Sequence, residues 1–378
     1  MRLRRTWLAT AGLAFCLGMT VGVFLPLREL ALKRTRVLRR AHNASEDSEV
    51  NRREGTPGSV TEEPMVNGIY WTERAERLVS PGFSDADLHL WRKKTRHASV
   101  RAVREGCGRM QNRLVMFDSG TWSCARYRQN NDQIQGELFS FYLAREMGMR
   151  NLPPAVLARA GGPGWHAVRP QLQLAQWRSD RPVVLTHFVD DLTAAYIPEV
   201  FRGPERRLHP QDVSNRSQDE IRDLVQWSDL IVFDYLTANL DRVVNNMFNQ
   251  QWNPDMMKAP AHNLARQGTT GLLVFLDNES GLVHGYRLLE KYESYHLSLL
   301  DALCVFRKST ADALEKLTRE KDIGSRLLRA FNTSEPGMDN YLPFLPGRSV
   351  TILNKRLALV NDRVTRCRDT YGALRSLG

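Results

Sequence analysis

The chain has 378 residues, of which 42% are hydrophobic and 25% are charged, so it can build one large domain or two lobes and is not a structureless chain. Its net charge is +11, but residues 1–40 hold nine Arg or Lys against the single Glu29, which accounts for +8 and leaves +3 for the rest. The basic residues therefore flank one apolar segment, where they would face lipid headgroups, and a nucleic-acid partner is not indicated.

An apolar segment near the amino end has the length of a membrane-spanning helix. Trp7–Leu27 contains 21 residues without a charge, and about 20 apolar residues cross a bilayer as a helix. No convincing small-x-small cleavage site lies near Phe24, so the sequence favours an uncleaved signal anchor over a cleaved signal peptide. Arginines and lysines lie on both sides of the segment, and the positive-inside rule does not orient it.

The chain then becomes polar before its first predicted helix. Residues 28–70 lack a sustained apolar period and predict a flexible stem. Ser84 is a natural N-cap, with Asp87 in the first turn of the helix that follows. Asp85 and Asp87 also form an Asp-x-Asp pair, which many Golgi glycosyltransferases use to bind manganese and a nucleotide sugar. No strand precedes Asp85 as that motif would need, and capping is a sufficient explanation.

Cysteines and glycosylation signals favour the lumenal side of a membrane. Four cysteines lie outside the apolar segment, and no two are close enough in sequence for a zinc knuckle. Four cysteines allow three pairings, and four free buried thiols remain an alternative. Sequons add to the lumenal interpretation, although such triplets are common by chance; they begin at Asn43, Asn215, Asn278 and Asn332. We predict glycans at Asn43, Asn215 and Asn332.

A strand pair and a helix follow. Arg113–Phe117 and Thr121–Tyr127 are short β-prone runs separated by a turn signal, and they predict a hairpin. Gln133–Met147 has apolar residues at helical spacing, and Glu137 falls on the packed face. A buried carboxylate without a partner costs about 3 to 5 kcal/mol, so Glu137 needs a cation. Arg126, on the second strand, is the candidate, unless it is simply exposed on that strand.

The residues with the strongest chemical signal lie in the second half of the chain. A helix with a capping box at Ser217 leads to Asp241. Asp241 and Asn246 stand five apart, the spacing of the base and the metal-binding amide in protein kinases. Leu272–Leu276 predicts a buried strand that ends at Asp277, where a kinase presents its carboxylate to Mg²⁺ or Mn²⁺. Either feature alone arises by chance, but their order favours phosphoryl transfer.

Two segments carry a resemblance to a known family. Phe233–Arg242 reads Phe-Asp-Tyr-Leu-Thr-Ala-Asn-Leu-Asp-Arg, and Leu276–Tyr286 reads Leu-Asp-Asn-Glu-Ser-Gly-Leu-Val-His-Gly-Tyr. They closely resemble the four-jointed family of Golgi kinases, which belongs to the secretory-pathway kinases together with the Golgi casein kinase. The likeness runs from about Gly106 to Cys367. It implies an α+β, two-lobe atypical protein-kinase-like fold with a small β-rich N-lobe and a larger helical C-lobe.

The resemblance implies a role for each matching residue. Asp241 would orient and deprotonate the acceptor hydroxyl, and Asp277 with Asn246 would hold the divalent metal ion. Arg126 and Glu137 would position the phosphates of ATP.

Two positions depart from the family pattern. Arg126 stands where the family has Lys, and a guanidinium is bulkier and planar, so the usual Lys geometry does not carry over unchanged. Asp132 matches an acidic metal-binding position with Asp in place of Glu, and it fits an ordinary helix cap equally well.

The resemblance also favours one set of disulfides. Cys107 with Cys124 would join neighbouring strands of the small lobe. Cys304 with Cys367 resembles a bridge of the kinase family and would tie the last helix to the body.

We therefore predict a lumenal serine/threonine kinase on a type II Golgi membrane anchor, using ATP with Mn²⁺ or Mg²⁺; stem cleavage would also release a secreted form. The predicted parts are a cytoplasmic tail (1–6), the anchor (7–27), a lumenal stem (28–70), the N-lobe (71–185) and the C-lobe (186–378). The resemblance implies extracellular domains as substrates, namely cadherin repeats of Fat/Dachsous type. Spacing and composition do not indicate the substrate.

Two alternatives remain. A Golgi glycosyltransferase would use Asp85 and Asp87. A catalytically silent kinase-like binding module would explain Arg126 and the lack of a glycine-rich loop, since Gly106-Cys-Gly108 is a poor substitute for three glycines.

Overall fold

A computed structural model describes residues 64–372. The chain divides into Met1–Glu62 and Glu63–Gly378, and all described residues belong to the second unit. The predicted anchor Trp7–Leu27, most of the predicted stem and Asn43 lie outside the described residues. None of the helices within residues 64–372 combines the length and apolarity that a bilayer crossing requires.

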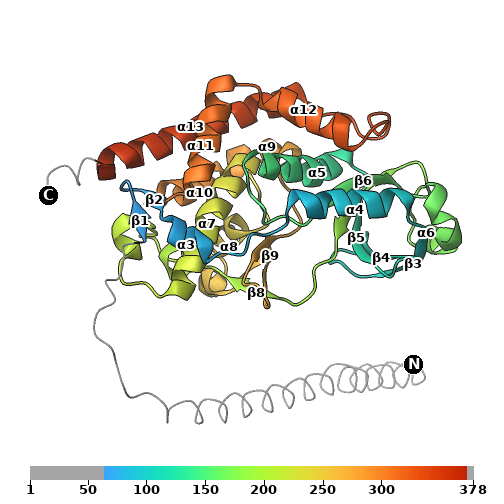
Figure 1. The fold of residues 1–378 in the computed structure, drawn as a ribbon, viewed down its shortest axis with the longest axis horizontal. Coiled ribbons are helices and arrows are strands. Elements are labelled where there is room, and N and C mark those ends of the chain that lie inside the picture. The colour runs from blue at the N-terminus through green and yellow to red at the C-terminus, as the bar shows by residue number, and fades with distance from the viewer. Residues whose placement is uncertain (1–63, 373–378) are drawn as a thin grey trace, which may run out of the picture. The chain divides into compact units, whose positions relative to one another are not determined.

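An antiparallel five-stranded sheet forms the small lobe, with strand order β3-β4-β5-β7-β6 (Figure 1). The predicted hairpin is confirmed as β4 and β5, which pair with Leu114 opposite Cys124. Gly120 in the connecting turn has φ 77°, a left-handed conformation that glycine adopts without strain. The strands are β3 (Val100–Glu105), β4 (Arg113–Phe117), β5 (Trp122–Tyr127), β6 (Ala155–Arg159) and β7 (Pro182–His187).

Helix α5 (Asn131–Glu146) packs against this sheet and confirms the helix predicted at 133–147. Asn130 caps it, accepting a hydrogen bond from the backbone of Asp132. The other face of α5 meets the large lobe. A Cβ at Gly136 would lie 2.6 Å from the carbonyl oxygen of Glu279, so only glycine allows this close approach. Helix α5 is thereby held against the segment around Glu279, which follows the predicted strand at 272–276.

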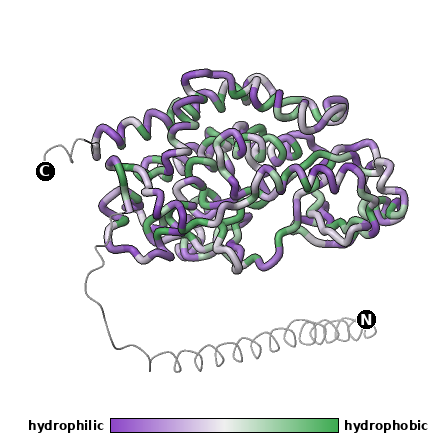
Figure 2. Tube along the Cα trace, in the orientation of Figure 1, coloured by the Kyte–Doolittle hydropathy of each residue, from purple (hydrophilic) through white to green (hydrophobic). Residues whose placement is uncertain are grey.

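The large lobe is helical, as predicted, and is built around α7 (Gln218–Thr237). Ser217 and Glu220 form the predicted capping box at its start, and most of the helix after its second turn is buried. The helices around it are α8 (Val243–Asn249), α9 (Val283–Arg287), α10 (Leu289–Asp301), α11 (Lys308–Glu320), α12 (Ile323–Ser334) and α13 (Gly347–Gly372). Hydropathy alternates along the outer helices (Figure 2), as expected where one face is buried.

A second, three-stranded sheet lies in the large lobe, with order β10-β9-β8 and antiparallel pairing. Its strands are β8 (Leu192–Tyr196), β9 (Pro260–Gln267) and β10 (Leu273–Phe275). All three residues of β10 are buried, which confirms the strand predicted from the apolar run at 272–276. The chain therefore reaches Asp277 directly from a buried strand.

One further helix of about three turns and several short helical elements complete the fold. They are α4 (Asp85–His97), α6 (Arg169–Leu174) and the 3₁₀ helices η2 (Pro163–Val168), η3 (Glu199–Phe201), η4 (Pro210–Val213) and η5 (Pro254–Lys258).

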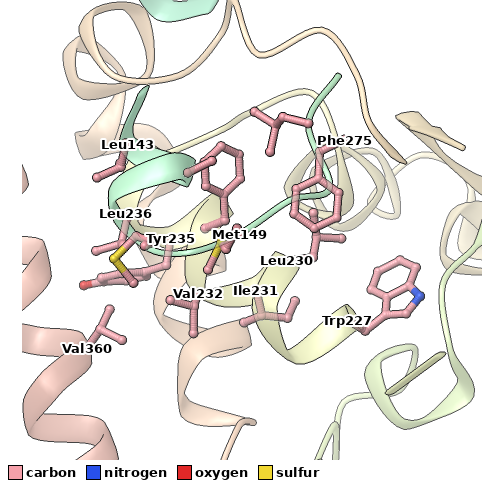
Figure 3. Packing of buried hydrophobic residues seen from close by; sticks show 14 of the residues in the cluster. Leu143, Met149, Trp227, Leu230, Ile231, Val232, Tyr235, Leu236, Phe275 and Val360 are labelled. Atoms are coloured by element: carbon pink, nitrogen blue, oxygen red, sulfur yellow. The ribbon is translucent and has the colours of Figure 1, made fainter. Parts of the chain in front are cut away.

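Two separate hydrophobic cores support the two-lobe description. The larger core joins α7 to its neighbours: Phe233 of α7 lies against Phe275 of β10, with ring centroids 5.7 Å apart. Leu143 of α5 and Leu230 of α7 belong to the same core (Figure 3). The smaller core lies in the small lobe, where Tyr127 stacks on Trp177 with ring centroids 5.0 Å apart. The predicted fold class is correct.

The folded unit begins earlier than predicted, and the stem boundary at 70 is wrong. Ile69 is fully buried, and its carbonyl oxygen accepts a hydrogen bond from the backbone of Phe306. The elements here are β1 (Met65–Val66), β2 (Tyr70–Trp71) and α3 (Glu73–Arg77), and α3 packs on α7 of the large lobe. A few apolar residues in short elements leave no sustained period, so the pattern at 64–70 resembled a stem.

Residues 302–307 are not helical, although the apolar residues of 297–317 continue at helical spacing through them. Leu303 pairs with Leu208 and Phe306 with Tyr70 in isolated bridges, so this stretch separates α10 from α11. Its backbone groups find partners in distant segments and not in a helical turn. Local periodicity does not register such partners.

Both implied disulfides are present. Cys107 is bonded to Cys124, and Cys304 is bonded to Cys367. The first fixes the turn between β3 and β4 to β5. The second joins the linker before α11 to the last helix.

We expect the Cys304–Cys367 bond to contribute about 4 kcal/mol to stability, because it closes a loop with a sequence separation of 63. Replacing both residues with Ser should lower the free energy of unfolding by this amount in denaturant titrations without reductant. The matched pair Cys107→Ser and Cys124→Ser closes a shorter loop and should cost about 3 kcal/mol. An unchanged unfolding midpoint for the first pair would contradict the assignment.

A buried carboxyl links α12 to the small lobe. Glu335 follows α12 and accepts a hydrogen bond from the hydroxyl of Tyr142 at 3.0 Å. Burial raises the pKa of Glu335 to about 7, although the hydrogen bonds and the nearby Arg92 and Arg96 oppose the rise. The folded protein thus binds this proton more tightly than the unfolded chain does.

It follows that Glu335 stabilises the fold fully below pH about 4.5, and that this contribution is lost as the pH rises through about 7. Between pH 4.5 and 8 the free energy of unfolding of the unchanged chain should fall by about 3 kcal/mol through this group. The Glu335→Gln variant lacks the carboxyl and should not show this fall in urea unfolding. Glu315→Gln, at an exposed site on α11, is the control. Equal pH dependence in all three proteins would count against a buried, proton-binding Glu335.

Candidate functional site

The predicted catalytic loop lies between α7 and α8. Ala238 ends α7 in a left-handed conformation with φ 51°, which turns the chain towards Asp241. The Asp241 backbone N–H donates to Oδ1 of Asn239 at 2.9 Å, and that same oxygen accepts from the hydroxyl of Ser280 at 3.0 Å. The carboxylate of Asp241 is 30% exposed. The loop is therefore fixed to the segment after β10 while its carboxylate stays accessible.

Arg242 anchors this loop from inside the protein. Its buried guanidinium pairs with Asp234 and donates to Oδ1 of Asn278 at 2.6 Å and to the carbonyl oxygen of Leu276 at 3.0 Å. Burial raises the pKa of Asp234 to about 6, although Arg242 opposes the rise. Sequence reasoning did not identify this residue. The signal available was a charged side chain directly before the two apolar residues Val243 and Val244.

Asp277 stands at the end of β10 with φ 49°, a conformation that Asp tolerates better than most residues. Its Oδ2 lies 2.7 Å from a terminal nitrogen of Arg126. Its Oδ1 is buried and has no hydrogen-bond partner among the described residues. A carboxylate oxygen left without a partner in this way is suited to a cation.

The predicted ion pair between the second strand and the helix is present. Nε of Arg126 donates to Oε1 of Glu137 at 3.1 Å, and both side chains are buried. Although burial alone disfavours the charged form, Glu137 and Asp277 raise the pKa of Arg126 above its ordinary value. The other carboxylate oxygen of Glu137 accepts the backbone N–H of Asn278 at 2.5 Å. Arg126 thus bridges the small lobe, α5 and the end of β10.

A second ion-pair system lies beside the first, and sequence reasoning missed it. Glu279, which is 1% exposed, pairs with Arg128 at 2.6 Å and with Arg109 at 2.8 Å. Arg109 also pairs with Asp241 at 3.2 Å. Arg128 directly follows β5 and lies two residues after Arg126, and this alternation of arginines was a usable signal. Arg109 comes from a turn 132 residues before Asp241, and no local pattern indicates that contact.

Negative charge exceeds positive charge in this cluster. Among the described residues that pair with one another here, the carboxylates are Glu137, Asp241, Asp277 and Glu279, and the guanidinium groups are Arg109, Arg126 and Arg128. Burial raises the pKa of Glu137, Asp241 and Glu279 above their ordinary values, and the charge of Asp277 adds to each rise. The arginines oppose these rises. A divalent cation beside Asp277 would relieve the excess, so the donor set fits Mg²⁺ or Mn²⁺.

The other two predicted metal ligands have different surroundings. The side-chain nitrogen of Asn246 donates to the carbonyl oxygen of Met256 at 2.7 Å, while its Oδ1 is buried without a hydrogen-bond partner among the described residues. Asp132 forms an ion pair with Arg287 of α9 and is not the cap of α5. No group of three or more His, Cys, Asp or Glu side chains in residues 64–372 is arranged to hold a metal ion. Among the described residues, no hydrogen bond or ion pair joins Asn246 or Asp132 to Asp277.

A small cavity adjoins the first ion pair. Its volume is only about 10 Å³, and its walls include Arg126, Glu137, Thr186, Phe275 and Asp277. Sites for drug-sized ligands usually occupy about 300 to 1,000 Å³. A nucleotide would therefore need additional space where the two lobes meet.

The alternative Asp-x-Asp site is occupied by structural contacts. Ser84 is the N-cap, as predicted, and Asp87 forms a capping box with it, while Asp85 pairs with Arg145 and Arg150. Both aspartates belong to helix α4 and do not follow a strand. This geometry gives no support to a glycosyltransferase.

Two of the three predicted glycan acceptors lie within residues 64–372. Asn215 and Asn332 are exposed, as a glycan acceptor must be. Asn278 is buried and bonded to Arg242, which agrees with leaving it out.

Comparison with known proteins identifies the family. The model of the four-jointed box protein middle domain matches residues 86–370. The chain belongs to the four-jointed box family. The extracellular serine/threonine protein kinase four-jointed of Drosophila melanogaster is 44% identical over 352 residues, covering 79% of this chain and 60% of that protein. Four-jointed box protein 1 of Homo sapiens is 43% identical over 314 residues, covering 81% and 71%.

Solved structures share the fold of this family member. Hydra Fam20 with sugar aligns with a TM-score of 0.53 at 15% identity, covering 79% of this chain and 96% of that one. The Golgi casein kinase with Mn/ADP bound aligns with a TM-score of 0.51 at 14% identity, covering 89% and 91%. The fold is therefore that of the Fam20-type kinases.

Loss of Arg126 should be costly because two buried carboxylates depend on it. We expect Arg126→Met to lower the free energy of unfolding by about 3 to 5 kcal/mol. Arg126→Lys should recover only part of this, since one ammonium lacks the planar fork that reaches both Glu137 and Asp277. Adding Glu137→Gln to Arg126→Met should also recover part of the lost free energy of unfolding, because it removes one of the buried carboxylates left without a partner.

Chemical denaturation measures these differences, with Arg101→Met at an exposed position of β3 as the control. A loss of less than about 1 kcal/mol for Arg126→Met would show that the bridge is not a stabilising element.

Proposed function

We propose that this family member is a serine/threonine protein kinase that transfers the γ-phosphate of ATP with Mn²⁺ or Mg²⁺. One observation carries the proposal: Asp241, Asp277, Glu137 and Arg126 belong to one continuous charged cluster where the two lobes meet. Their order along the chain and their elements match the parts of a kinase site. The name of the Drosophila relative, an extracellular serine/threonine protein kinase, supports the same activity.

Each residue has a task in this mechanism. Asp241 is accessible and accepts the proton of the attacking Ser or Thr hydroxyl. Burial raises the pKa of Asp241, so this group loses its function as base when the pH falls through that raised value. Arg126 is held between Glu137 and Asp277 and directs its positive charge to the phosphates.

The metal ion would be held by Asp277 through its unpaired oxygen and by Asn246 through its amide oxygen, with Asp132 as a further candidate. The bound metal would neutralise charge on the phosphates and align them for transfer. Arg242 directly follows the base and bonds to Asp234 of α7 and to the Leu276 carbonyl oxygen after β10, so it keeps the base and the metal-binding segment in a fixed relation.

The proposal extends to place and substrate. Two disulfides fit an oxidising compartment such as the secretory pathway, and the solved neighbours include a Golgi casein kinase. We propose a type II anchor at Trp7–Leu27, a lumenal Golgi location, and Ser or Thr acceptors in extracellular cadherin repeats. The substrate class rests on the family resemblance alone.

The decisive experiment is transfer of labelled γ-phosphate from ATP by the purified full chain with Mn²⁺. Asp241→Asn should lower the rate about 10²- to 10⁴-fold, since it removes the general base. Asp277→Asn should abolish transfer because the metal loses its carboxylate. Asp85→Asn is the matched control and should retain the unchanged rate.

Equal incorporation by the unchanged chain and Asp277→Asn would show that the assigned ligand is wrong. No phosphate transfer by any of these proteins, together with sugar transfer from a nucleotide sugar that Asp85→Asn abolishes and Asp277→Asn does not, would favour the glycosyltransferase alternative. Absence of any thermal shift with Mn²⁺ and nucleotide would favour the silent binding module.

A further inference from the structure

The turn between β3 and β4 carries Arg109 across the site. Gly106, Cys107 and Gly108 all have positive φ, and the Cys107–Cys124 disulfide fixes the turn to β5. The side chain of Asn112 adds a hydrogen bond to the carbonyl oxygen of Cys107 at 2.8 Å. A firmly anchored backbone therefore presents a long side chain, 49% exposed, to the large lobe.

Arg109 makes two contacts of different kinds. One terminal nitrogen lies 2.8 Å from Glu279, which is buried and also held by Arg128. The other lies 3.2 Å from Oδ2 of Asp241, which is partly exposed. The contact with Glu279 can persist while the contact with Asp241 is exchanged, because Glu279 fixes one half of the guanidinium.

The contact between Arg109 and Asp241 involves the residue that we assign as the general base. A general base must come within about 2.6 to 3.2 Å of the proton that it removes. With Arg109 on Oδ2, the carboxylate of Asp241 is partly covered and its charge is neutralised. Phosphate oxygens offer a guanidinium stronger, bidentate partners than one partly exposed carboxylate does.

We propose that Arg109 gates the catalytic base: it pairs with Asp241 in the nucleotide-free protein and passes to phosphate oxygens when a nucleoside di- or triphosphate binds. Nucleotide binding then uncovers Asp241 for the acceptor hydroxyl, so the nucleotide binds first. The inference rests on the proposed kinase function and adds a positioning residue and an order of binding to it. No bond is made or broken in this exchange.

The test is a double-mutant cycle in nucleotide affinity, with Mn²⁺ and ADP as the probe and calorimetry on the purified full chain. Arg109→Ala should weaken binding about 10- to 100-fold, the usual loss for a charge-assisted hydrogen bond. Arg109→Lys should recover part of it. Arg101→Ala, which removes the same charge from an exposed position on β3, should stay within about twofold.

The gate itself is tested by Asp241→Asn. This change frees Arg109 from its carboxylate partner, so it should tighten ADP binding several-fold in the unchanged chain and less in the Arg109→Ala background. A purely structural role for Arg109 would not couple the two residues. Thermal melts of each variant check that it is folded.

Four results would overturn the proposal. Unchanged ADP affinity in Arg109→Ala would remove the phosphate contact, and tighter binding would make Arg109 a competitor of the nucleotide. An equal effect of Asp241→Asn in both backgrounds would exclude the exchange. A complete lack of ADP binding by the unchanged chain would overturn the kinase function as well as the gate, whereas the first three results would leave the kinase function standing.

Discussion

The arrangement of the site depends on the buried bridge from Glu137 through Arg126 to Asp277. Arg126 comes from the small-lobe sheet, Glu137 from α5 and Asp277 from the end of β10, so one guanidinium holds three elements together. A buried carboxylate without a partner would cost several kcal/mol. The small lobe therefore supplies the guanidinium that neutralises Asp277 of the large lobe. An arginine suits this position because its planar fork reaches two carboxylates at once.

The sequence predicted the parts of the site that follow local rules. Helical spacing placed Glu137 on a packed face, and the need for a cation pointed to Arg126. The apolar run before Asp277 indicated the strand that presents it. Turn chemistry and the capping box at Ser217 located their elements correctly. These features are encoded within about 15 residues, where period and propensity apply.

Other parts depend on contacts between distant segments. Arg109 meets Asp241 across 132 residues, and the buried Ile69 accepts a backbone hydrogen bond from the distant Phe306. Residues 302–307 leave helical geometry for partners near 70 and 208. No window of local sequence contains these partners. The metal ligands raise the same difficulty, since the spacing of Asp241 and Asn246 does not determine which way the amide oxygen faces.

Close packing decides which part of the site can move. At Gly136 a Cβ would lie 2.6 Å from the Glu279 carbonyl oxygen, and at Gly285 it would lie 2.2 Å from that of Ala238. The segment after β10 is therefore tightly packed between α5, α9 and the catalytic loop. Arg242 donates hydrogen bonds to Leu276 and Asn278 of this segment. A shift of α5 would separate Glu137 from both Arg126 and the Asn278 backbone. Space for a nucleotide is thus more easily made by side chains of the β3–β4 turn than by movement of α5, so the carboxylates are already positioned before a nucleotide binds.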